Sequence, residues 1–132
     1  MQKTYLFILL ASLCFLSFET QATVIFVDYS SSGTNTGASW TNAFTTLQPA
    51  LNAASAGDTI FIASGTYKPT HIPSTGGTST TSRDLSFYLD KDIKIYGGFA
   101  GTETALSQRN IGSNPVILSG DIGTSGSNSD NC

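Results

Sequence analysis

Apolar residues recur at helical spacing between residues 46 and 57. The apolar positions are Leu47, Leu51 and Ala54. They follow at i, i+4 and i+7, which places them on one face of a helix. A hydroxyl at Thr46 can cap the first turn, and the missing N–H of Pro49 costs nothing within that turn. Gly57 tolerates the left-handed conformation in which many helices end. We therefore predict a short amphipathic helix that begins after Thr46 and ends at Gly57.

Alternating and β-branched runs predict strands on both sides of this helix. The runs cover residues 23–28, 59–62, 85–89, 93–96 and 116–118. Within the second run, alternation sends Ile60 and Ile62 to one face and Phe61 to the other. Gly-rich or Ser-rich corners, among them residues 64–66, separate the runs. The chain therefore reads as one short helix among several short strands and turns.

The pattern W..AF..LQ.AL..A..GDTI.I..GTY, over residues 40–67, resembles a known structural family. It is similar to the N-terminal cap and first coil of right-handed parallel β-helix proteins, the pectin-lyase-like superfamily. The stretch IKIYGGFAGTETALSQRN, followed by VILSGD, resembles a block in large secreted β-helix proteins of Gram-negative bacteria. Many of those are surface proteins related to the polymorphic outer-membrane-protein repeats. The resemblance implies a mainly β fold: an incomplete, single-stranded parallel β-helix with one short capping α-helix.

In such a solenoid the strands of successive coils stack, so Ile60, Ile95 and Ile117 are expected in one interior column. Ile95 and Ile117 are separated by about one coil of 20-odd residues. The Ser/Thr/Gly-rich insertion at residues 68–84 accounts for the longer step before Ile95. Because the family pattern calls for another strand after the last residue, we expect residues 23–132 to be the N-terminal cap and first coils of a longer protein.

Residues 1–22 have the composition of a cleavable secretory signal peptide. Lys3 precedes an apolar run at residues 5–18, and Ala22 supplies the small residue expected at a cleavage site. The apolar run is too short for a membrane span. Cleavage would leave Cys132 without an internal disulfide partner. We therefore expect a protein that is secreted or displayed on a Gram-negative cell surface, with no membrane span after signal cleavage.

Charge and composition argue against nucleic-acid binding. The formal net charge is −3, and the six Lys and Arg residues are scattered along the chain. Proteins that track phosphates carry a basic stripe, which this sequence lacks. Richness in Gly, Ser, Thr and Asn suits many turns and exposed strands.

Individual residues offer few candidates for chemistry. His71 is the single histidine, and without acids or cysteines close by in sequence it is interpreted as a solvated loop residue rather than a base or metal ligand. Trp40 is interpreted as an anchor beneath the helix, with a sugar-stacking platform as the alternative. Glu103 and Arg109 are expected to pair across the corner that the glycines of residues 97–101 permit. These interpretations assign structural rather than catalytic roles.

The acidic residues are weak candidates for calcium ligands. Asp90 and Asp92 flank a lysine and fit a turn cap better than a cation site, which needs several oxygens. Asp121 and Asp130 match neither an EF-hand loop nor a Gly/Asp nonapeptide repeat. We therefore predict no catalytic, cofactor-binding or metal-binding residues, with calcium as the open alternative.

Three functions are compatible with these features. The first, which we favour, is a non-catalytic structural or adhesin-like scaffold that displays loops, with polysaccharide or host-surface ligands as partners of the full-length protein. The second is the N-terminal piece of a polysaccharide lyase or glycoside hydrolase with the same fold. No paired carboxylates, G-x-S-x-G motif or zinc spacing supports it here. The third is a truncated chain without activity of its own.

Overall fold

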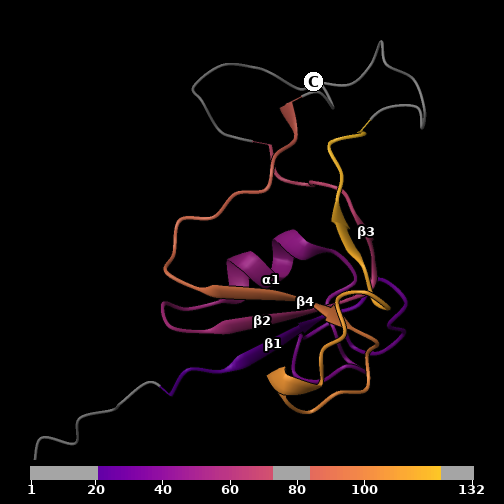
Figure 1. The fold of residues 1–132 in the computed structure, drawn as a ribbon. Helices are drawn as coiled ribbons and strands as arrows, with labels where there is room; N and C mark the ends of the chain where they lie inside the picture. Colours follow the sequence, from indigo (N-terminus) through magenta and orange to yellow (C-terminus); the bar gives the residue numbers. More distant parts are fainter. Residues whose placement is uncertain (1–20, 73–83, 123–132) are drawn as a thin grey trace, which may run out of the picture.

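The computed structural model describes residues 21–72 and 84–122 (Figure 1). Three predictions fall on residues outside these ranges. They concern the signal peptide up to residue 20, most of the 68–84 insertion, and the Gly/Ser/Asn-rich tail that contains Asp130. The described elements, in chain order, are β1 (Val24–Val27), α1 (Leu47–Ala53), β2 (Thr59–Ala63), β3 (Gly65–Tyr67), β4 (Lys94–Phe99), a 3-10 helix η2 (Leu106–Gln108) and β5 (Val116–Leu118).

The strands form two small parallel sheets. The first has the order β1-β2-β4, with Ile25 opposite Ile60 and Ile60 opposite Ile95. The second pairs β3 with β5. Only Ser64 separates β2 from β3, so one extended segment contributes a strand to both sheets. Figure 1 shows β1, β2 and β4 side by side with α1 against them, while β3 and β5 run away at an angle.

The main core lies between α1 and one face of the three-stranded sheet. Its buried residues are Val27, Leu47, Ala50, Leu51, Ala54, Ile60, Ile62 and Tyr67. Burial of this apolar stripe provides the stability that a seven-residue helix lacks by itself. The predicted core faces of the helix and of β2 are confirmed. The helix starts after Thr46 as predicted, but the Thr46 side chain makes no capping hydrogen bond. The helix ends at Ala53, and Gly57, with φ +91°, forms the turn that follows.

A second, aromatic layer covers the opposite face of the sheet. Phe61 stacks on Phe99 with ring centroids 4.4 Å apart. Trp40 packs against Phe26 at 4.7 Å and donates its indole N–H to the carbonyl of Glu103. Aromatic pairs in these geometries add to the stabilisation from burial itself. Trp40 is therefore an anchor in a packed layer, but this layer lies on the face of the sheet opposite α1 and not beneath the helix as predicted.

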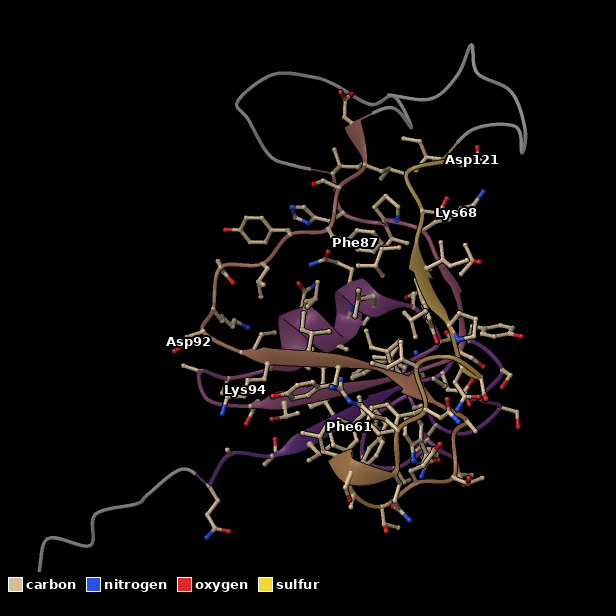
Figure 2. All side chains as sticks on the ribbon, in the orientation of Figure 1. Phe61, Lys68, Phe87, Asp92, Lys94 and Asp121 are labelled. Atoms are coloured by element: carbon tan, nitrogen blue, oxygen red, sulfur yellow. The ribbon has the colours of Figure 1, made fainter. Side chains whose placement is uncertain are left out.

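Two local predictions are wrong. Residues 85–89 do not form a strand, and only Ser86 makes an isolated bridge, to His71. The buried Gln48 side chain binds the backbone of Tyr88 and thereby takes the hydrogen bonds that a neighbouring strand would need. Conversely, Gly65–Tyr67, expected as a corner, forms β3. The side chain of Phe87 still packs against the core near α1 (Figure 2).

The predicted parallel β-helix is not what the described chain forms. Ile60 and Ile95 are register partners, but Ile117 pairs with Thr66 in the other sheet and is 54% exposed. A solenoid would need a continuous stack, whereas this fold has a few short parallel strands in two separate sheets and one helix. Sequence spacing sets the length of chain between strands, but not the sheet that each strand joins.

Candidate functional site

An apolar cleft of about 280 Å³ opens between β4 and β5. Its lining residues are Ile62, Ile95, Gly97, Gly98, Arg109, Ile111, Val116 and Leu118. Ile62 forms the buried floor, whereas Ile111 and Leu118 remain 64% and 53% exposed. The side chains of Val116 and Leu118 line the cleft, whereas the sequence predicted that Ile117 would point to the interior. We call this feature the β4–β5 cleft.

The edge strand β4 presents backbone groups beside the cleft. Lys94 N–H donates to the carbonyl of Asp58 in the turn before β2. Because hydrogen bonding alternates along a parallel strand, Lys94 and Tyr96 face β2, while Ile95 directs its N–H and C=O groups and Gly97 its N–H outward. Beyond Tyr96 the register with β2 shifts by one residue. Among the described strands, none lies beyond β4.

The strand β5 has the same property in the second sheet. The N–H of Gly65 donates to Pro115, and the N–H of Ser119 donates to Tyr67. The same alternation leaves the backbone groups of Val116 and Leu118 directed outward. The cleft is therefore bordered by two outward-facing strand edges.

The opposite edge of the three-stranded sheet is covered. The N–H groups of Phe26 and Asp28 donate to the carbonyls of Gly37 and Phe44, and Phe44 N–H donates back to Phe26. The loop before α1 thus satisfies the outward groups of Phe26 and the N–H of Asp28. Of the two edges of this sheet, the β1 edge is covered there by described residues, whereas no described strand pairs with the β4 edge.

Gly97 and Gly98 let the loop between β4 and β5 pack closely against β4 at one end of the cleft. Gly98 has φ +98°, and a Cβ there would lie 3.1–3.2 Å from atoms of Ile111. A Cβ at Gly97 would lie 2.9 Å from Val116. The carbonyl of Gly98 accepts hydrogen bonds from Asn110 N–H and the Asn114 side chain, which hold the connecting loop against β4. The Gly-Gly pair therefore lets this loop approach the strand closely.

The charged side chains near the cleft do not form the predicted ion pair. The guanidinium of Arg109 lies 5.3 Å from the ring centre of Tyr96, a cation–π geometry. The carboxylate of Glu103 accepts the N–H groups of Ala100, Gly101 and Thr102 at 2.7–3.0 Å. Burial raises the pKa of Glu103, but these backbone donors outweigh it and leave the pKa below its ordinary value. The Glu103–Arg109 prediction is wrong because each side chain has a nearer partner.

A second, more polar cavity lies at the start of β1. Its volume is about 350 Å³, and its lining residues are Gln21, Thr23, Ile25, Ala53, Ser55, Ala56 and Asp58. Asp58 is buried, and its two carboxylate oxygens accept the N–H groups of Thr23 and Ser55, each at 2.8 Å. The hydrogen bond from Thr23, followed by that from Ser55, lowers the pKa of Asp58 despite its burial.

The remaining predicted residues occupy structural positions. His71 is half-buried and stacks on Tyr88, with ring centroids 4.9 Å apart, rather than standing in solvent. Between Asp90 and Asp92, Lys91 donates to the carbonyls of Asn52 and Ala54 at 2.7 Å and so caps the end of α1. Across the part of the chain that the structure describes, no group of three or more His, Cys, Asp or Glu side chains is arranged to hold a metal ion.

Sequence reasoning missed the β4–β5 cleft. Its wall comes from Ile111, an isolated apolar residue between polar neighbours, and no periodicity marks it. The Gly97-Gly98 pair was the available signal, since adjacent glycines allow close backbone approach.

Comparisons with known proteins identify no relatives. No family model, curated protein or solved structure matches the chain. In residues 21–72 and 84–122, no helix has the length and apolar character needed to cross a membrane.

Proposed function

We propose that this chain is a non-catalytic scaffold module of an exported or cell-surface protein, and that the β4–β5 cleft receives an extended polypeptide segment from a partner protein. The observation that carries the proposal is the coincidence of an apolar cleft with two outward-facing strand edges. Addition of a strand to an open sheet edge is a general mode of peptide recognition.

The backbone defines the shape of the partner. Residues 59–67 already run along β4 and β5 from one side, because β2 pairs with β4 and β3 pairs with β5. A second segment with the same bend after five residues would meet the outward groups of Ile95, Gly97, Val116 and Leu118. The partner segment therefore needs two short extended stretches joined by a corner.

The cleft defines the side chains of the partner. Ile95, Ile111 and Leu118 together present a contiguous apolar surface. Burial of such a surface contributes about 25 cal/mol per Å². The partner segment should therefore carry Val, Ile or Leu at alternate positions, as β2 does at Ile60 and Ile62.

Catalysis has less support within the described residues. The carboxylates of Asp58 and Glu103 are both occupied by backbone N–H groups. Their lowered pKa values favour the charged form, which does not suit a general acid. The polysaccharide or host-surface ligand anticipated for the full-length protein stays a prediction.

A peptide titration tests the proposal. The probe is a synthetic peptide of residues 59–67, TIFIASGTY, added to the exported chain. We expect saturable binding and slower amide exchange at Ile95 and Gly97. Ile95→Lys should weaken binding by at least about tenfold, because a charge would enter the apolar cleft.

The matched control is Val24→Lys. Val24 and Ile95 lie on the two outer strands of the same sheet and have nearly equal exposed fractions, 39% and 38%, but Val24 lies outside the cleft. This variant should bind the peptide like the parent chain. Equal loss of binding in both variants, or dimerisation of the chain through β4 in place of peptide binding, would contradict the proposal.

A further inference from the structure

The polar cavity at the start of β1 holds Thr23 by both of its backbone groups. Its N–H donates to Oδ1 of Asp58 at 2.8 Å, and its carbonyl accepts the N–H of Thr59 at 2.9 Å. Asp58 is only 6% exposed, and its other oxygen is taken by Ser55. A buried carboxylate thus points at the backbone nitrogen of one particular residue.

That residue is the one that follows the predicted signal-peptide cleavage site. Hydrolysis of the Ala22–Thr23 peptide bond adds a hydroxyl to the carbonyl carbon of Ala22 and a proton to the nitrogen of Thr23. At neutral pH the new carboxylic acid releases a proton and the new amine takes one up. The nitrogen of Thr23 then carries three N–H donors and a positive charge in place of one neutral N–H.

We propose that Asp58 is the binding site for the amino terminus created at Thr23 when the signal peptide is removed. The hydrogen bond from a neutral N–H to the Asp58 carboxylate becomes an ion pair between an ammonium group and that carboxylate, without any movement of the nitrogen. Cleavage thereby strengthens the interaction between the start of β1 and the turn that precedes β2. The proposal depends on cleavage after Ala22 and is independent of the β4–β5 cleft.

Other features of the polar cavity at Asp58 are compatible with an ammonium group on Thr23. Gln21 and Ala22 are exposed, so the bond between Ala22 and Thr23 lies at the surface. The cavity beside Thr23 has room for the two additional N–H groups. The lowered pKa of Asp58 keeps its carboxylate charged at neutral pH. Each property is needed for the pair to form.

Three other charged residues contact the same turn. Lys91 donates to the carbonyl of Ala54, Asp92 accepts the N–H of Gly57 through its carbonyl, and Lys94 donates its own N–H to the carbonyl of Asp58. Figure 2 shows Asp92 and Lys94 near the start of β4. Of these three contacts, only that of Lys91 is made by a charged group, since Asp92 and Lys94 contact the turn through their backbones.

The experiment compares the processed chain, which begins at Thr23, with a chain that retains Gln21 and Ala22. Mass spectrometry of the exported protein first establishes the processed terminus. We expect the unfolding equilibrium constant of the processed chain to be about tenfold lower than that of the extended chain. In an Asp58→Asn background this difference should disappear.

A direct titration makes the test independent of variant stability. The α-amino group of the processed chain, followed by NMR, should have a pKa above that of the same group in denaturant, because the carboxylate favours the ammonium form. An amine that titrates alike in the folded and denatured chain would overturn the proposal. A processed chain that begins at another residue would also overturn it.

Discussion

Gln48 holds Tyr88 by two hydrogen bonds between one side-chain amide and one backbone residue. Gln48 Nε2 donates to the carbonyl of Tyr88 at 3.0 Å, and the N–H of Tyr88 donates to Gln48 Oε1 at 2.9 Å. The side chain replaces a neighbouring strand, which explains how a segment without regular structure packs over α1. Gln48 is buried, so this pair is shielded from water.

The first prediction concerns this amide. Gln48→Glu replaces the donor to the Tyr88 carbonyl with an oxygen, and a buried carboxylate then faces a carbonyl. We expect the free energy of unfolding to fall by about 2 kcal/mol, as measured by urea denaturation at pH 7. Gln108→Glu is the matched control, because Gln108 Oε1 accepts from Thr104 and Ala105 and a carboxylate can do the same. If the two variants lose equal stability, the Gln48–Tyr88 pair does not have this role.

The second prediction separates backbone strain from steric crowding. Gly57 and Gly98 have similar positive φ values, +91° and +98°, but a Cβ at Gly57 would meet no atom within 4 Å. Gly57→Ala should therefore cost only the backbone strain, about 1 kcal/mol. Gly98→Ala should cost more, because the loop carrying Ile111 must also move.

Thermal unfolding of the two alanine variants measures the difference. Peptide binding provides a second readout, since displacement of Ile111 alters the β4–β5 cleft only in Gly98→Ala. Similar melting temperatures for both variants would contradict the prediction, because they would mean that the loop carrying Ile111 accommodates a methyl group without loss of stability.

The third prediction follows from the lowered pKa of Glu103. A carboxylate whose pKa is lower in the folded chain stabilises the fold at pH values above its ordinary pKa. That contribution is lost as the pH falls through the lowered folded-state pKa. Glu103→Gln should therefore destabilise the chain at pH 7, by about 1 kcal/mol, and much less in acid.

Urea denaturation at pH 7 and at successively lower pH values checks this expectation. The glutamine amide also places N–H groups opposite the N–H groups of Gly101 and Thr102, which adds to the loss at neutral pH. A stability difference that does not change with pH would mean that the charge of Glu103 contributes nothing.

The local spacing of apolar residues in the sequence predicts most of the described elements. The spacing of Leu47 and Leu51 placed α1 and its buried face, and alternation placed Ile60 and Ile62 against it. Four of the five predicted strand positions, those at residues 23–28, 59–62, 93–96 and 116–118, overlap β1, β2, β4 and β5, although β4 extends three residues further than predicted, to Phe99. These features depend on the period of one segment at a time, which the chain displays directly.

Local pattern did not anticipate the pairings made by polar groups. Nothing in the run at residues 85–89 reveals that Gln48 will occupy the backbone of Tyr88. Similarly, no spacing rule distinguishes Glu103 paired with Arg109 from Glu103 bound by backbone N–H groups. Both outcomes depend on which group arrives nearest when distant segments fold together.

From the order of residues alone one can therefore read the short helix, most of the strands and the interior face of β2, because each reflects a period of 3.6 or 2 along the backbone. Only the three-dimensional arrangement decided that β5 joins β3 and not the stack of β1, β2 and β4. It also decided that a cleft opens between β4 and β5 and that Asp58 meets Thr23. The physical reason is that strand partners and buried charges are chosen by competition among segments far apart in the chain, and that competition leaves no periodic trace in any of them.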